Sequence, residues 1–167
     1  PPLVAGVYLL WGAQAGWPLR LGGALYVTAV CALAYLLASR KWGVREGTMA
    51  ACLMAFFLTF GLPSAVMALA ADLLLVLPHL AAVYLAWRGR PFWSGAAAGV
   101  GLLVNAKAAV VLCVCGLWQW RAAPRLLAGF AAPNLLWVGW LAASGALEAY
   151  WRQVWQLGLL YAGHTFL

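Results

Sequence analysis

The chain has 167 residues, of which 67% are hydrophobic and only 8% carry a formal charge. A soluble domain is about half apolar and about one quarter charged, so this composition excludes a soluble domain. A bilayer accommodates such a chain, because lipid-facing side chains can be apolar all around a helix of about 20 residues. The net charge is +7, but the basic residues form short clusters rather than a basic face, so we expect no nucleic acid as partner.

Taken in chain order, the apolar runs predict an all-α fold, a polytopic transmembrane helix bundle that forms one domain over residues 1–167. The first run, 3–11, is too short to cross a membrane and precedes the helix breakers Gly12, Gly16 and Pro18, so we predict an interfacial helix. Membrane spans are predicted over 21–38, 48–62, 64–87, 93–106, 108–120 and 126–147, followed by an amphipathic outer tail over 148–167.

The basic residues predict the orientation of these spans. Seven of the ten Lys and Arg residues fall in three short segments: Arg40, Lys41 and Arg45, then Arg88 and Arg90, then Arg121 and Arg125. Since Lys and Arg accumulate in short cytoplasmic loops, we expect these segments on the cytoplasmic side. The tail then lies on the extracytoplasmic side.

The stretch from Trp93 to Trp120 could be one long span, but Lys107 would then lie in mid-membrane. We therefore predict two short helices that meet at a turn near residues 105–107. Irregular backbone at membrane depth is tolerated only against protein or a water-filled cavity. A turn at this place would therefore mark a cavity.

Three charged residues are candidates for chemistry. Asp72 is the only Asp of the chain and lies in an apolar run, where an isolated carboxylate costs about 3 kcal/mol or more, so we expect it to face a polar cavity. A wet position near the outer surface or a helix cap is the alternative. Lys107 would attract an anion such as a lipid phosphate, unless it merely extends its charge to the interface. Arg20 would hold a phosphate on the outer face or act as an interfacial anchor.

Other polar and small residues have simpler interpretations. His79 and His164 each lack a second histidine nearby, and we expect structural hydrogen bonds for both. Cys113 and Cys115 lack the spacing of a zinc site, so no metal site is expected there. Glu148 and Arg152 are predicted to form a surface pair. Gly95 and Gly99 form a small-residue face that favours close helix packing.

Several short segments occur in an order that is typical of one membrane family. They are Pro1-Pro2-Leu3 followed by Gly16 and Arg20, the basic loop Ser39-Arg40-Lys41-Trp42-Gly43, the acidic position Asp72, and the stretch from Gly95 to Lys107. In this order they resemble the N-terminal membrane part of polytopic lipid-linked-sugar glycosyltransferases. This GT-C class includes the protein O-mannosyltransferases and the lipid A aminoarabinose transferase.

The resemblance implies an enzyme of the bacterial inner (plasma) membrane, with membrane lipid around it. Its reaction would transfer a sugar from a polyprenyl-phosphate-linked donor to a lipid or protein acceptor on the extracytoplasmic side. Asp72 would be a catalytic carboxylate that acts through a divalent metal ion or the acceptor, and Lys107 and Arg20 would bind the substrate. The family's main catalytic acid belongs to an outer loop that would precede Pro1, so we expect this chain to be an inactive piece of a longer enzyme.

Two alternatives from other classes remain. In a transporter or lipid flippase, Asp72 and Lys107 would line a substrate path between broken helices. In a non-catalytic membrane scaffold, the Gly95 and Gly99 face would hold the helices together and Asp72 would be dispensable.

Overall fold

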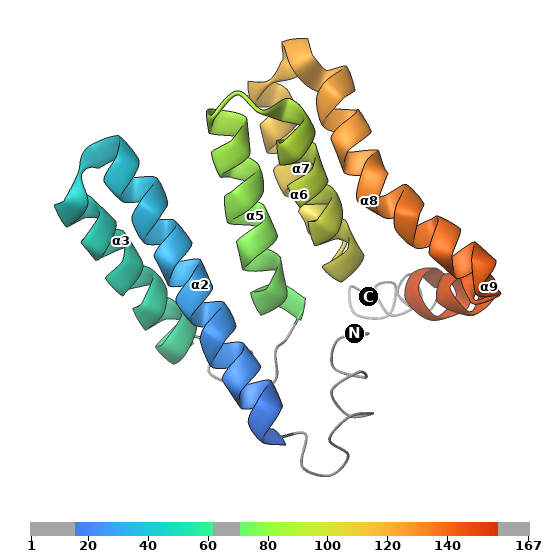
Figure 1. Ribbon diagram of the computed structural model, residues 1–167, viewed down its shortest axis with the longest axis horizontal. Coiled ribbons are helices and arrows are strands. Elements are labelled where there is room, and N and C mark those ends of the chain that lie inside the picture. Colours follow the sequence, from blue (N-terminus) through green and yellow to red (C-terminus); the bar gives the residue numbers. More distant parts are fainter. Residues whose placement is uncertain (1–15, 62–70, 157–167) are drawn as a thin grey trace, which may run out of the picture.

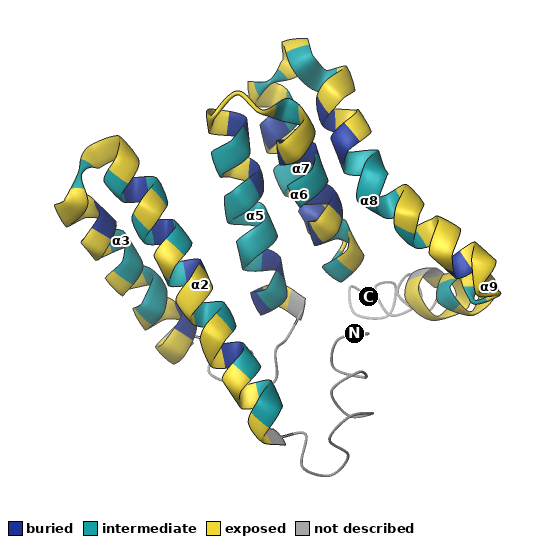
Figure 2. Cartoon of the chain, viewed as in Figure 1, coloured by how far each residue is buried: buried dark blue, intermediate teal, exposed yellow. Residues whose placement is uncertain are grey.

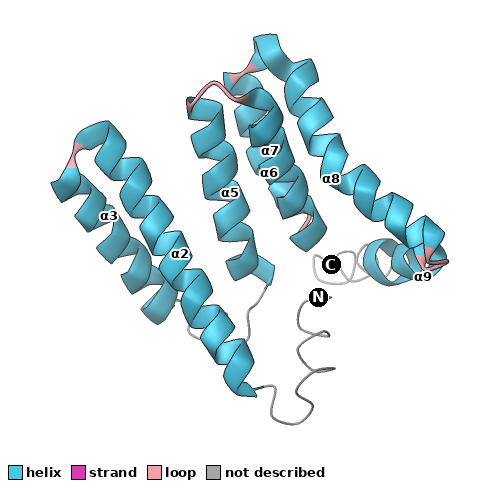
Figure 3. Cartoon of the chain, viewed as in Figure 1, coloured by secondary structure: helices cyan, strands magenta, loops and turns pink. Residues whose placement is uncertain are grey.

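The structure is a computed structural model that describes residues 16–61 and 71–156 (Figure 1). Over these residues it contains helices and no strand (Figure 3), which confirms the all-α class. The main helices are α2 (Gly16–Trp42), α3 (Val44–Phe56), α5 (Ala71–Trp87), α6 (Pro91–Val104), α7 (Ala108–Trp118), α8 (Ala123–Ala143) and α9 (Leu147–Tyr150). Short helical segments of other types follow three of them: the π-helices η2 (Phe57–Gly61) and η4 (Trp151–Gln156) and the 3-10 helix η3 (Trp120–Ala122). The predicted interfacial helix 3–11 lies outside the described residues, as do residues 157–167 of the predicted tail.

The helices alternate in direction between two ends of the molecule (Figure 1). The turns that join α2 to α3, α5 to α6 and α7 to α8 lie together at one end. These turns and the adjoining helix ends carry the seven Lys and Arg residues of the three predicted loops, so we call this the basic end. The starts of α5 and α7 and the end of α6 lie at the other end, which we call the opposite end.

Several helix boundaries differ from those predicted. α2 begins at Gly16 rather than at 21 and contains Pro18 in its first turn, where proline is tolerated because the first N–H groups have no helical partner. α3 begins at Val44 rather than at 48, because Gly43 adopts φ 122° and reverses the chain within one residue. The predicted break near 105–107 is confirmed, since α6 ends at Val104 and α7 begins at Ala108.

α6 and α8 run side by side in the same direction with their backbones in contact. A Cβ atom at Gly95 would lie 1.9 Å from the carbonyl oxygen of Leu126, and one at Gly129 would lie 1.9 Å from that of Phe92. At Gly99 the nearest atom would be the carbonyl oxygen of Phe130, 2.5 Å away. The small-residue face predicted on α6 therefore serves helix packing, as expected.

Two described segments are long and apolar enough to cross a membrane, Trp17–Trp42 and Trp120–Ala143. Only 22% and 17% of their apolar windows are buried by the described chain. Figure 2 shows exposed residues along α2 and a longer exposed stretch in the second half of α8. A core helix of a soluble protein would be mostly buried, so these helices favour membrane association. The remaining apolar helices are shorter: Asp72–Trp87, Pro91–Val104 and Ala108–Trp118.

Candidate functional site

Asp72 and Lys107, which the sequence analysis expected in one polar site, meet at the opposite end. Asp72 lies in the first turn of α5 and Lys107 in the turn before α7. The ammonium nitrogen Nζ of Lys107 is 2.8 Å from Oδ1 of Asp72. The side-chain amide of Asn105 donates a second hydrogen bond, of 3.2 Å, to the same oxygen. We call these three residues the Asp72–Lys107 cluster.

Asn105 builds the turn that holds Lys107 in place. Its backbone is extended, with φ −157° and ψ 139°, which ends α6. Its side-chain oxygen accepts a hydrogen bond of 3.0 Å from the backbone N–H of Lys107, and its carbonyl accepts one of 3.1 Å from the N–H of Ala108. An asparagine that bonds the backbone two residues ahead forms an Asx turn. One side chain therefore shapes the helix break and binds Asp72.

The cluster retains unused hydrogen-bonding capacity. Both donors bind Oδ1 of Asp72, and Oδ2 makes no hydrogen bond within the described residues. The ammonium of Lys107 has three N–H donors and uses one of them here. An oxyanion can therefore bind Lys107 while a hydroxyl group donates to Oδ2 of Asp72.

The cluster lies on the surface of the described part of the chain rather than in an enclosed cavity. The side chain of Lys107 is 65% exposed and that of Asp72 is 54% exposed. Asp72 lies in the first turn of α5, so the described residues agree with the alternative of a wet position at a helix end, and the polar cavity stays a prediction. A ligand can reach both side chains without any rearrangement of the described helices.

Arg20 is not joined to this cluster. It is exposed on α2, and no hydrogen bond or ion pair connects it to Asp72 or Lys107 within the described residues. Its predicted role in substrate binding stays a prediction.

The remaining candidates show no second site in the described ranges. The Nε2 atom of His79 is buried without a hydrogen-bond partner there, so the structural hydrogen bond expected for this residue is not seen at that atom, and His164 lies outside those ranges. All four cysteines are free, and residues 16–61 and 71–156 contain no group of three or more His, Cys, Asp or Glu that could hold a metal ion. Glu148 and Arg152 form the predicted surface pair, with 2.5 Å between Oε1 and Nη2.

Asn105 was predicted only as part of a turn, and its contact with Asp72 was not predicted. An asparagine at a helix break next to a lysine was the available signal, but its partner is 33 residues away. No family model, curated protein or solved structure matches the chain.

Proposed function

We propose that the chain is the multi-pass membrane part of a glycosyltransferase, and that the Asp72–Lys107 cluster belongs to its extracytoplasmic site. The enzyme would transfer a sugar from a polyprenyl-phosphate donor to a hydroxyl group of a lipid or protein acceptor. The observation that carries the proposal is the ion pair between Asp72 and Lys107 at the end of an apolar bundle that faces away from the basic turns (Figure 1).

The basic end supports this orientation. All three basic turns lie there (Figure 1), as the positive-inside rule requires of a cytoplasmic face. The same end carries five exposed tryptophans at helix ends or in adjoining turns: Trp42, Trp87, Trp93, Trp118 and Trp120. Tryptophans gather at the headgroup level of membranes, so they favour a bilayer boundary near this end.

The short lengths of α6 and α7 support a site at membrane depth. Their 14 and 11 residues rise about 21 and 17 Å at about 1.5 Å per residue, which is less than the hydrocarbon thickness of about 30 Å. With the basic end at the cytoplasmic headgroups, the turn at residues 105–107 lies below the outer headgroups. The phosphate of a long-chain lipid reaches this depth while its hydrocarbon tail stays in the bilayer.

The charges of the cluster suit the transfer of a phosphate-linked sugar. The bond between the sugar C1 and the phosphate oxygen breaks, and the acceptor oxygen forms a new bond to C1. The ammonium of Lys107 stabilises the departing phosphate as a point charge. The acceptor hydroxyl donates to a carboxylate, which takes its proton, and Oδ2 of Asp72 is the unpaired carboxylate oxygen of the cluster.

Binding of the carrier lipid tests the proposal. The purified chain in phosphatidylcholine nanodiscs is titrated with undecaprenyl phosphate, and tryptophan fluorescence reports binding. Lys107→Gln should weaken binding about tenfold, because it removes a charged hydrogen bond to the phosphate. Arg152→Gln is the matched control, since it removes the cation of the other exposed ion pair and should leave the affinity unchanged. Equal affinities of the two variants, or no binding to the wild type, would contradict the proposal.

A lipid flippase is the second candidate, and the non-helical turn between α6 and α7 favours it. A flippase would move a labelled polyprenyl phosphate between the leaflets of sealed vesicles, whereas a transferase would only bind it. If the wild type moves the labelled lipid between the leaflets and Lys107→Gln does not, the result would favour the flippase over the transferase.

A further inference from the structure

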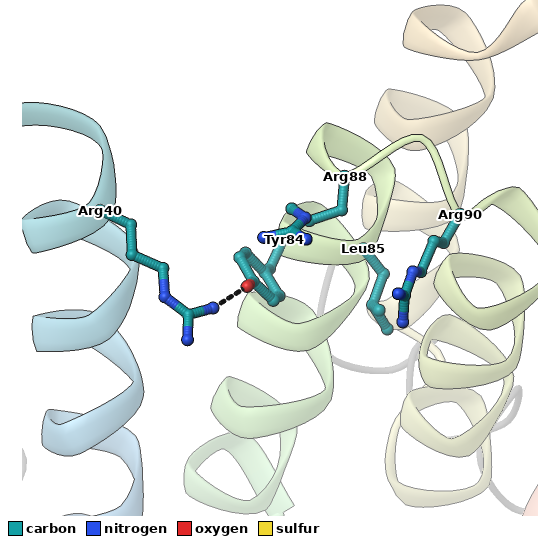
Figure 4. A pocket seen from close by; sticks show the side chains of 5 residues that line it. All are labelled: Arg40, Tyr84, Leu85, Arg88 and Arg90. Atoms are coloured by element: carbon teal, nitrogen blue, oxygen red, sulfur yellow. Dashed lines mark hydrogen bonds between the residues drawn. The ribbon is translucent and has the colours of Figure 1, made fainter.

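A second cluster of charge lies at the basic end, away from the Asp72–Lys107 cluster. A pocket of about 320 Å³ is lined by Arg40, Tyr84, Leu85, Arg88 and Arg90 (Figure 4). Arg40 comes from the last turn of α2, Arg88 follows α5, and Arg90 directly precedes α6. Three guanidinium groups from different segments of the chain therefore line one small cavity. We call it the arginine pocket.

Tyr84 organises two of the three arginines. A guanidinium N–H of Arg40 donates a hydrogen bond to the hydroxyl of Tyr84. The guanidinium carbons of Arg40 and Arg88 each lie 5.9 Å from the centre of the Tyr84 ring, within the range of cation–π attraction. Figure 4 shows both side chains pointing toward this ring. Both exposed side chains are thus in contact with Tyr84.

Within the described residues, no carboxylate neutralises the arginine pocket. The chain has three acidic residues, and in the described part Asp72 pairs with Lys107 and Glu148 pairs with Arg152. Glu46, on the first turn of α3, makes no ion pair with any of the three arginines. Three like charges in one cavity repel one another, and an anion with several acceptor oxygens would relieve this repulsion.

The positive-inside rule alone does not account for this arrangement. It requires basic residues in cytoplasmic turns, and Arg45, Arg121 and Arg125 satisfy it at the same end without lining the pocket. Guanidinium groups bind phosphate through parallel N–H donors, and basic pockets between membrane helices on the cytoplasmic side bind the head groups of anionic lipids.

We propose that the arginine pocket binds a phosphate group at the basic end of the protein. The phosphate comes either from the head group of an anionic lipid or from a soluble phosphate, and the chemistry of recognition is the same. This site is separate from the Asp72–Lys107 cluster. A failure of the proposed glycosyltransferase function would therefore not contradict phosphate binding in the arginine pocket.

Arg90 and Arg125 provide a matched pair of variants. Both are exposed arginines at the basic end, and neither side chain makes a hydrogen bond or ion pair within the described residues, so both variants should fold. Only Arg90 lines the pocket. The purified chain is placed in nanodiscs of phosphatidylcholine with or without phosphatidylglycerol, and native mass spectrometry measures the lipid retained. Inorganic phosphate, added to discs of phosphatidylcholine alone, tests the soluble source by its effect on the melting temperature.

The wild type should retain phosphatidylglycerol or be stabilised by inorganic phosphate. Arg90→Gln should lower the affinity for the ligand that acts about tenfold, since it removes charged hydrogen bonds to the phosphate. Arg125→Gln should leave this affinity unchanged. An effect of phosphatidylglycerol alone identifies a lipid head group, and an effect of inorganic phosphate identifies a soluble ligand. If neither ligand acts on the wild type, or if both variants weaken the effect equally, the pocket is not a phosphate site.

Discussion

The hydroxyl of Tyr26 on α2 donates a hydrogen bond of 2.5 Å to the backbone carbonyl of Leu74 on α5. Pro78 lies four residues after Leu74 inside α5, and because proline has no N–H, this carbonyl lacks its helical donor. The same hydroxyl accepts a hydrogen bond of 3.2 Å from the N–H of Leu77. Tyr26 thus satisfies the backbone group that the proline leaves free, and it ties α2 to α5 at that point.

Replacement of Tyr26 by Phe should destabilise the fold. The carbonyl of Leu74 would lose its donor in a partly buried position, at a cost of about 1–3 kcal/mol. Thermal unfolding in detergent, followed by helical circular dichroism, measures the change. Tyr35→Phe is the control on the same helix, because the Tyr35 hydroxyl makes no hydrogen bond within the described residues, and its melting temperature should stay at that of the wild type.

A double-mutant cycle should identify Pro78 as the cause. In a Pro78→Ala background the amide of residue 78 can donate to the Leu74 carbonyl, so Tyr26→Phe should cost less than in the wild type. The cycle uses the same unfolding measurement on the four proteins. Equal costs in both backgrounds would show that the tyrosine acts through packing and not through the carbonyl.

Added side chains at the contact between α6 and α8 should separate the two helices. Gly95→Ala places a methyl group where the Leu126 carbonyl oxygen lies 1.9 Å away, and such overpacking costs about 1–3 kcal/mol or more. Gly139→Ala on α8 is the control, because a Cβ there meets no atom of the described chain within 4 Å. Alanine favours helix over glycine by about 1 kcal/mol, so the control should melt at the same or a higher temperature.

Exchange of the charges of Asp72 and Lys107 separates a structural role from a binding role. An exposed ion pair contributes about 0.2–1 kcal/mol to the free energy of unfolding. Each single variant should lose this stability, and the double variant Asp72→Lys with Lys107→Asp should recover it. Undecaprenyl phosphate binding should not recover, because the cation then sits on α5 instead of on the turn at residues 105–107. Recovery of both stability and binding would show that only the presence of the pair matters.

The orientation of the bundle can be measured by labelling. We expect the basic end in the cytoplasm, so a cysteine at Arg45 should react with a membrane-impermeant maleimide only after the cells are permeabilised. A cysteine at Ser144, which follows α8 away from the basic end, should react in intact cells. Both substitutions are made in a background without Cys31, Cys52, Cys113 and Cys115. The reverse pattern would invert the proposed sidedness.

The helices and the break between α6 and α7 could be predicted from the sequence, because both depend on local interactions. Apolar runs favour helices whose backbone hydrogen bonds are satisfied within the segment. The break at residues 105–107 depends on Asn105, whose side chain bonds the backbone N–H of Lys107 two residues ahead. The starts of α2 and α3 were predicted less well, because both helices begin before their apolar runs. Pro18 is tolerated in the first turn of α2, and the positive φ of Gly43 lets α3 begin directly after α2.

By itself, the sequence determined an apolar helical chain whose basic residues recur at every second turn. These features depend only on the composition and hydrophobic periodicity of each segment. Only the tertiary structure decided which segments meet. The bond of Asn105 to Asp72 spans 33 residues, the bond of Tyr26 to Leu74 spans 48, and that of Arg40 to Tyr84 spans 44. Such contacts depend on which helix faces pack together. The glycines that bring the backbones of α6 and α8 into contact are another result of that choice. Hydropathy contains no information about that choice, because the apolar faces of these helices are alike.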